Sequence, residues 1–172
     1  MKNIEIERKY LVKKKQIPFN YKKYKCIKIA QAFIYLKPAI RIRKSNKDYF
    51  LTVKNKIKLN ANIQNDLARF EYEIPISRKA YNELSKKING RIIYKSRYII
   101  PYKIDKKKYN IELDVFEKDF KGLIYAEVEF RNLNDAIKFR PPDWFYKDVT
   151  GIEKYKNTTL SKCKNVKNYL QY

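Results

Sequence analysis

The chain has 172 residues, and its 41 Lys and Arg against 18 Asp and Glu give a formal net charge of +23. It has no histidine and three glycines (Gly90, Gly122, Gly151), which excludes a Ser-His-Asp triad, an HExxH zinc site and the glycine-rich loops that bind nucleotide phosphates. Hydrophobic residues make up 44% of the sequence, which together with its length predicts one folded domain over residues 1–172.

The cysteines and the apolar segments indicate the cellular compartment of the protein. Cys26 and Cys163 are far apart and form no metal or redox motif. No run of 18 apolar residues occurs, and the first ten residues alternate charge with isoleucine instead of forming a signal core. We therefore expect a cytoplasmic protein without a membrane partner.

Apolar and polar residues alternate along most of the chain, which is the period of a β-strand. The pattern predicts eight strands, at residues 2–12, 27–36, 38–45, 48–56, 66–76, 91–102, 108–117 and 123–131. Between the fifth and sixth strands, Ser77 is a helix N-cap, residues 78–88 have a helical period, and Gly90 ends the helix. A short helix is expected after Asn134 and before Pro141, and the last 20 residues are expected to be helical or irregular.

The polar faces of the predicted strands carry mainly charged residues, often two positions apart. Such pairs share one face of a strand and lie about 7 Å from each other. The carboxylate pairs are Glu5 and Glu7, Glu112 and Asp114, and Glu127 and Glu129; the cation pairs are Arg41 and Arg43, and Lys95 and Arg97.

An ordinary antiparallel sheet with one solvated face explains the alternation, but not the pairing of acids beside pairs of cations. Carboxylate pairs that face one another would form an oxygen-lined site for a hard divalent cation. Because an apolar core could not desolvate so many charges, the pattern favours a closed, water-filled barrel with the charges inside. Helices would then cover the apolar outside.

Glu5-Ile6-Glu7-Arg8-Lys9 is an ExExK motif, and further motifs follow it along the chain. They are Gln31-Ala32-Phe33, Arg41-Ile42-Arg43, Thr52-Val53-Lys54, Arg69-Phe70-Glu71-Tyr72-Glu73, Lys95-Ser96-Arg97-Tyr98, Glu112-Leu113-Asp114-Val115-Phe116 and Ala126-Glu127-Val128-Glu129-Phe130. In this order they resemble the CYTH superfamily, the triphosphate tunnel metalloenzymes, from residue 3 to about residue 160. The resemblance implies an α+β fold, a closed eight-stranded antiparallel β-barrel with a few helices outside and a tunnel that binds a triphosphate.

The resemblance also implies individual roles. The triphosphate-binding cations would be Lys9, Arg41, Arg43, Lys54, Lys95 and Arg97. The metal ligands would be Glu5, Glu7, Asp114, Glu127 and Glu129, holding Mg²⁺ or, alternatively, Mn²⁺, and the catalytic residues would be Lys9, Glu5, Glu7 and Asp114. For Glu71 and Glu73 a structural ion pair with a neighbouring arginine is expected. The segment Asp148-Val149-Thr150 has no assigned role, and Asp148 stands where the family usually has Glu.

Phosphoryl transfer requires neutralised charge and aligned reactants, with little covalent work by the protein. We therefore expect metal-dependent hydrolysis of a small polyanion, most simply inorganic tripolyphosphate to pyrophosphate and phosphate. Without histidine, the base must be a carboxylate or a metal-bound hydroxide.

Other functions stay open at this stage. One is hydrolysis of an organic triphosphate, such as thiamine triphosphate or a nucleoside triphosphate. Class IV adenylate cyclase activity is less favoured, because the residues before Glu5 are not the His-Phe pair of those cyclases. The alternative of another class is a basic module that binds nucleic acid or polyphosphate without cleaving it. Glycine is too scarce for an RRM-like motif, which disfavours nucleic acid. Nothing in the sequence indicates an oligomeric state.

Overall fold

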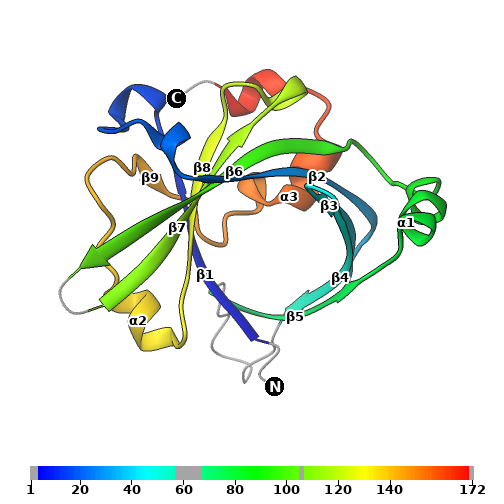
Figure 1. Ribbon diagram of the computed structural model, residues 1–172, viewed down its shortest axis with the longest axis horizontal. Coiled ribbons are helices and arrows are strands. Elements are labelled where there is room, and N and C mark those ends of the chain that lie inside the picture. The colour runs from blue at the N-terminus through cyan, green and yellow to red at the C-terminus, as the bar shows by residue number, and fades with distance from the viewer. Residues whose placement is uncertain (1–3, 57–66, 105–106, 171–172) are drawn as a thin grey trace.

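Eight antiparallel strands form a closed barrel in the computed structural model, which describes residues 4–56, 67–104 and 107–170 (Figure 1). The strands are β1 (Ile4–Leu11), β2 (Lys25–Leu36), β3 (Ala39–Ser45), β4 (Asp48–Lys56), β5 (Ala68–Pro75), β6 (Ile93–Ile104), β7 (Lys107–Phe116) and β8 (Ile124–Glu129). Their order is β5-β4-β3-β2-β6-β7-β8-β1, and pairing of β1 with β5 closes the ring. The predicted closed barrel is confirmed.

The strand boundaries differ from the predicted ones by a few residues. The predicted start of the first strand, residues 2–3, lies outside the described residues. A ninth strand, β9 (Lys147–Asp148), adds to β1 through two residue pairs and was not predicted. Two residues are too few to show an alternating pattern in the sequence, so β9 is identified only by its pairing with β1 in the structure.

Of the three α-helices in the described residues, the first two lie against the outside of the barrel and the third packs at one end of its interior. They are α1 (Arg78–Ser85), α2 (Leu133–Lys138) and α3 (Asn157–Lys162), with short 3₁₀ helices at Lys14–Gln16, Tyr21–Lys23, Lys118–Phe120, Glu153–Tyr155 and Val166–Tyr169. The Ser77 hydroxyl accepts a 3.1 Å hydrogen bond from the Ala80 N–H, as expected of an N-cap. The helix ends at Ser85, earlier than predicted.

Gly90 has a different role from the predicted helix stop. Its φ is +116°, and a Cβ added to it would lie 2.5 Å from the carbonyl oxygen of Ser161 in α3. Glycine is therefore needed here because the chain passes close to α3 in a left-handed conformation. The neighbouring Arg91 N–H donates a 2.7 Å hydrogen bond to the same carbonyl oxygen.

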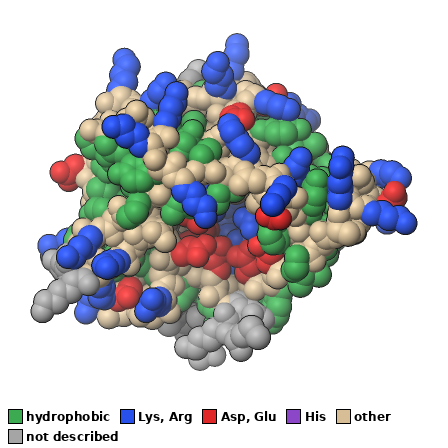
Figure 2. Space-filling view, in the orientation of Figure 1, with side chains coloured by type: hydrophobic (Ala, Val, Ile, Leu, Met, Phe, Trp, Pro, Cys, Tyr) green, Lys and Arg blue, Asp and Glu red, His purple; other side chains and the backbone are tan. Residues whose placement is uncertain are grey.

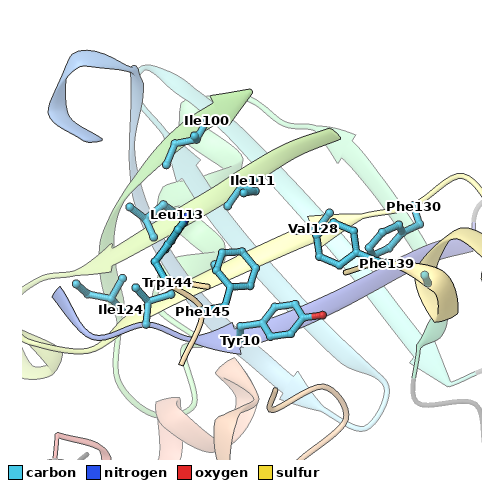
Figure 3. Packing of buried hydrophobic residues seen from close by; sticks show 13 residues of the cluster. Tyr10, Ile100, Ile111, Leu113, Ile124, Val128, Phe130, Phe139, Trp144 and Phe145 are labelled. Atoms are coloured by element: carbon cyan, nitrogen blue, oxygen red, sulfur yellow. The ribbon is translucent and has the colours of Figure 1, made fainter. Parts of the chain in front are cut away.

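The outer faces of β1, β6, β7 and β8 carry one hydrophobic core (Figure 3). The segment from α2 to the start of β9 covers these strands with Phe139, Trp144 and Phe145. The rings of Tyr10 and Phe145 lie 4.6 Å apart, and Trp144 packs edge-on against Phe145. Each buried aromatic side chain contributes about 1.5–3 kcal/mol, so this cover holds the ExExK strand firmly in the barrel.

A second core fills one end of the barrel interior. Leu11, Phe33, Phe116 and Tyr125 share the inward faces of their strands with the polar residues, at one end of each polar row, and they pack with Leu160 of α3. One end of the barrel interior is therefore apolar, and the rest of the interior is charged.

The expected apolar cover of the outside is incomplete, since Tyr72 and Ile74 on β5 are each 55% exposed. In the part of the chain that the structure describes, no helix has the length and apolar character needed to cross a bilayer.

Candidate active site

Charged side chains from seven of the barrel strands line a cavity of about 1580 Å³ (Figure 2). They are Glu5, Glu7 and Lys9 of β1, Arg41 and Arg43 of β3, Lys54 of β4, Arg69, Glu71 and Glu73 of β5, Lys95 and Arg97 of β6, Glu112 of β7, and Glu127 and Glu129 of β8. In the space-filling view, acidic side chains border a central hollow and basic side chains lie behind them. The alternating pattern of the sequence thus places its charges inside the barrel.

The structure brings together ten of the eleven residues for which a site role was predicted, all on the cavity wall. The exception is Asp114, which has no exposed surface and lies behind Lys95 and Arg97. The Arg97 guanidinium donates two hydrogen bonds of 2.7 Å to its two oxygens, and the Lys95 ammonium donates a further one. In this arrangement Asp114 holds two cations in place and presents no oxygen to the cavity.

On the β3–β5 side, two carboxylates of β5 bind the cations of β3 and β4. Arg43 Nη2 donates a 2.6 Å hydrogen bond to Glu73 Oε1, and Arg41 Nη2 lies 3.1 Å from Glu71 and 3.3 Å from Glu73. Lys54 Nζ lies 2.9 Å from Glu71 and donates to both oxygens of Glu5, at 2.8 and 2.7 Å. The expected ion pairs of Glu71 and Glu73 are therefore present, and they involve Arg41 and Arg43 across the sheet.

On the β1–β8 side, Glu127 is the central acid. Lys9 Nζ lies 2.9 Å from one of its oxygens and Arg97 Nη2 lies 2.6 Å from the other. Burial would raise the pKa of Glu127, but Lys9, Lys95 and Arg97 hold that pKa well below its usual value. Burial would likewise lower the pKa of Lys9, and the Glu127 and Glu7 carboxylates raise it instead. Both groups are therefore charged at neutral pH.

Beside Glu127, four more carboxylates gather at the junction of β1, β7 and β8, namely Glu5, Glu7, Glu112 and Glu129. The strand register sets Glu7 opposite Glu129, and Glu112 opposite Glu127. Burial, followed by the nearby charges of Glu112, Glu5 and Glu7, raises the pKa of Glu129 to about 7. Within the described residues Glu129 forms no ion pair, so this cluster has an excess of negative charge that a cation would neutralise.

This acidic junction (Glu5, Glu7, Glu112 and Glu129) is suited to a hard divalent cation by its chemistry, since carboxylate oxygens are the ligands that Mg²⁺ and Mn²⁺ prefer. Across the described ranges, however, no three His, Cys, Asp or Glu side chains are already arranged to hold a metal. Glu5 is bound by Lys54, and Glu7 lies 3.9 Å from Arg69. Metal binding therefore requires these carboxylates to leave their cation partners.

The raised pKa of Glu129 predicts a pH dependence of stability. Between pH 4.5, the ordinary pKa of the group, and about pH 7 the folded protein binds more protons than the unfolded chain. The free energy of unfolding should therefore fall as the pH rises through this interval and level off above it. Burial also raises the pKa values of Glu5 and Glu112, which adds to the trend in the same direction.

The check is urea denaturation in EDTA at several pH values, for the wild type and for Glu129→Gln. The variant should show a smaller loss of stability between pH 5 and pH 8, because the group that titrates near 7 is gone. Equal slopes for the two proteins would show that Glu129 does not titrate in this range.

Several polar residues of the cavity wall had no individual role assigned from the sequence, among them Gln31, Arg69 and Glu112. Arg69 and Glu112 each lie two positions from an assigned or motif residue on the same strand face, which is a signal that could have found them. Gln31 is 1% exposed, and its Nε2 and the Nε of Arg43 are buried without a hydrogen-bond partner in the described structure. The two residues are direct neighbours across β2 and β3, so both donors are available to an anion in the cavity.

The segment Asp148-Val149-Thr150 lies along the edge of β1 and fixes the backbone of that strand. Asp148 forms an ion pair with Arg8, whose side chain points away from the cavity. The Lys9 N–H donates a 3.0 Å hydrogen bond to the Thr150 hydroxyl, and the Val149 N–H donates a 2.9 Å one to the Lys9 carbonyl. This segment therefore positions Lys9 from behind without contacting the cavity through Asp148.

A closed eight-stranded antiparallel barrel with acids and cations on its inner wall is the architecture of the triphosphate tunnel proteins. The chain belongs to the CYTH family, since the CYTH domain model matches residues 3–140.

The similarity to individual proteins extends over most of the chain. This chain is 32% identical over 162 residues to a protein of Nitrosomonas europaea named inorganic triphosphatase, and the match covers 91% of this chain and 96% of that one. A protein of Acetivibrio thermocellus with the same name is 30% identical over 162 residues, covering 92% and 93% of the two chains. A crystal structure of an inorganic triphosphatase superposes with a TM-score of 0.61 at 31% identity, covering 91% of this chain and 93% of the other.

Proposed function

We propose that the protein is a metal-dependent triphosphatase that hydrolyses inorganic tripolyphosphate to pyrophosphate and phosphate inside the barrel. The observation that carries this proposal is the convergence of six cations from β1, β3, β4 and β6 on one cavity. Two relatives at 30–32% identity that carry the name inorganic triphosphatase support the choice of substrate.

The cations would bind the phosphates in two ways. Arg41, Arg43 and Arg97 can each donate paired hydrogen bonds to phosphate oxygens, whereas lysines act as point charges. The lysines are Lys9, Lys54 and Lys95. Because these groups converge from different sides of the barrel, a linear anion between them would be held in a fixed orientation, which aligns the bond to be cleaved.

The metal would be Mg²⁺ or Mn²⁺, held by Glu5, Glu7 and Glu129 with Glu127 beside them. A bound divalent cation would neutralise part of the triphosphate charge and polarise its P–O bonds. The role proposed for Asp114 is to position Lys95 and Arg97, since both of its oxygens accept hydrogen bonds from them.

The attacking water would be activated by a carboxylate of the wall or by the bound metal, because the chain has no histidine. Glu129 has a pKa of about 7 in the metal-free protein, raised by burial and by Glu112, Glu5 and Glu7, so it would lose its proton on binding the metal.

The proposed setting is cytoplasmic. Cys26 and Cys163 are both free thiols in the structure, which is what a reducing compartment favours. The proposed partner is the small polyanionic substrate.

Phosphate release from tripolyphosphate tests the proposal. We expect release with Mg²⁺ or Mn²⁺, none in EDTA, and slower release from thiamine triphosphate and ATP. The proposal is wrong if no phosphate is released from tripolyphosphate with either metal. Faster release from an organic triphosphate would assign the protein to that substrate instead.

A further inference from the structure

The two acids of β5 occupy the positions that an incoming phosphate would need. Glu73 accepts hydrogen bonds from Arg43 at 2.6 Å and from the Thr52 hydroxyl at 2.7 Å, and it also contacts Arg41. Glu71 contacts Arg41 at 3.1 Å and Lys54 at 2.9 Å. Each carboxylate therefore binds two of the cations to which the phosphate-binding role is given.

Glu73 has its contacts away from the acidic junction where a metal fits, whereas Glu71 borders that junction, because Lys54 contacts both Glu71 and Glu5. Both acids lie on β5, while Glu129 and Glu112 lie on β8 and β7. Burial would raise the pKa values of Glu71 and Glu73, but Lys54 and Arg43, respectively, and other neighbouring groups lower them, so both acids stay ionised. They are therefore permanent negative charges placed against the anion-binding cations.

The balance of charges on the cavity wall shows how these two acids affect the binding of an anion. The chain carries +23 overall, yet the barrel strands contribute seven cations and seven carboxylates to the wall, with Asp114 beneath it. The strand residues of the wall therefore carry no excess of positive charge. Apart from the Nε of Arg43, an anion gains the cations that Glu71 and Glu73 bind by displacing these carboxylates, and a longer phosphate chain has more oxygens and more charge with which to do so.

We propose that Glu71 and Glu73 are a built-in counter-anion that competes with phosphate groups for Arg41, Arg43 and Lys54. This inference rests on the proposed function. The competition weakens the binding of short phosphates more than that of triphosphate, because a short phosphate cannot replace both carboxylates. After cleavage, the two acids recapture the cations and release pyrophosphate and phosphate.

Binding measured by calorimetry tests this idea with tripolyphosphate in EDTA, where no hydrolysis is expected, and with pyrophosphate both in EDTA and with Mg²⁺. Glu73→Gln keeps the size of the side chain and an oxygen acceptor but removes the negative charge. We expect it to bind pyrophosphate about 10-fold or more tightly than the wild type, the size of one charge-assisted contact, and tripolyphosphate more tightly by a smaller factor. Glu71→Gln should act in the same direction and gives a second, independent variant.

The control is Glu83→Gln on α1, whose side chain is 62% exposed and pairs with Lys86 at the surface. It should bind both anions as the wild type does. If Glu73 and Glu71 only hold the arginines in position, their glutamine variants would bind both anions more weakly, and that result would overturn the inference. Equal affinity in wild type and variants would overturn it too.

The outcome also separates this inference from the proposed function. A wild type that neither binds tripolyphosphate in EDTA nor releases phosphate from it with metal contradicts the function itself. A wild type that does both, with glutamine variants that gain no affinity for pyrophosphate, contradicts the counter-anion alone. Melting curves of each variant show that it is folded.

Discussion

Lys9→Ala is expected to reduce phosphate release from tripolyphosphate by about 10²- to 10³-fold, the effect of losing one preorganised group that stabilises the transition state. Lys9 is 8% exposed, lies on the cavity wall and contacts the central acid Glu127 at 2.9 Å. Its ammonium also lies 5.5 Å from the centre of the Tyr125 ring. The charge is therefore fixed in position before the substrate arrives, which is the condition for a large electrostatic contribution.

The matched control is Lys47→Ala, which removes an exposed lysine from the turn between β3 and β4. It should leave the rate unchanged, although it lowers the net charge by the same amount. Glu127 keeps its 2.6 Å contact with Arg97 in the Lys9 variant, so the barrel should remain folded. Equal losses of activity in the two variants would mean that overall charge, and not this position, determines the rate.

The alternation of residues was enough to predict which side chains face the interior. In Arg41-Ile42-Arg43, for example, the arginines line the cavity and Ile42 has no exposed surface on the other face. A period of two residues fixes the face of each side chain wherever one face is buried. The closed barrel follows from the same pattern, since charged faces on seven of its strands need a common, hydrated interior.

Alternation does not fix the height of a residue along the barrel axis. Glu112 and Asp114 share one face of β7, but Glu112 lines the cavity, whereas Asp114 lies next to Phe116 at the apolar end. Strand register decides this difference, and register depends on cross-strand packing that a single strand does not encode. The sequence therefore found the acidic pair but could not tell which of its members reaches the cavity.

The aromatic cover of β1 and β8 was also missed, for a related reason. Phe139, Trp144 and Phe145 lie in an irregular segment around Pro141 and Pro142, so no period marks them. Their positions are set by the surface on which they pack. The functional residues could be predicted because they lie on regular strands. The aromatic residues that hold these strands in place could not, because they lie in an irregular segment.

Asp114→Asn is expected to lower the free energy of unfolding by about 3–5 kcal/mol, the usual cost of removing one partner of a buried ion pair. Lys95 is 2% exposed, and burial already lowers its pKa against the opposing effect of Asp114. Without that carboxylate, the ammonium is left buried beside Arg97, which repels it. Arg97 itself keeps Glu112 and Glu127 as partners, so the loss falls on Lys95.

The measurement is the urea midpoint, with Asp119→Asn as the control. Asp119 contacts Arg91 at 2.7 Å, but its side chain is 51% exposed, so its loss should cost no more than about 1 kcal/mol. Adding Lys95→Met to Asp114→Asn should restore much of the stability, because the uncompensated charge is then removed as well. If the double variant is no more stable than Asp114→Asn, the buried ammonium is not the cause of the loss. A midpoint for Asp114→Asn as high as that of Asp119→Asn would mean that Asp114 is not the buried counter-charge on which the cations of β6 depend.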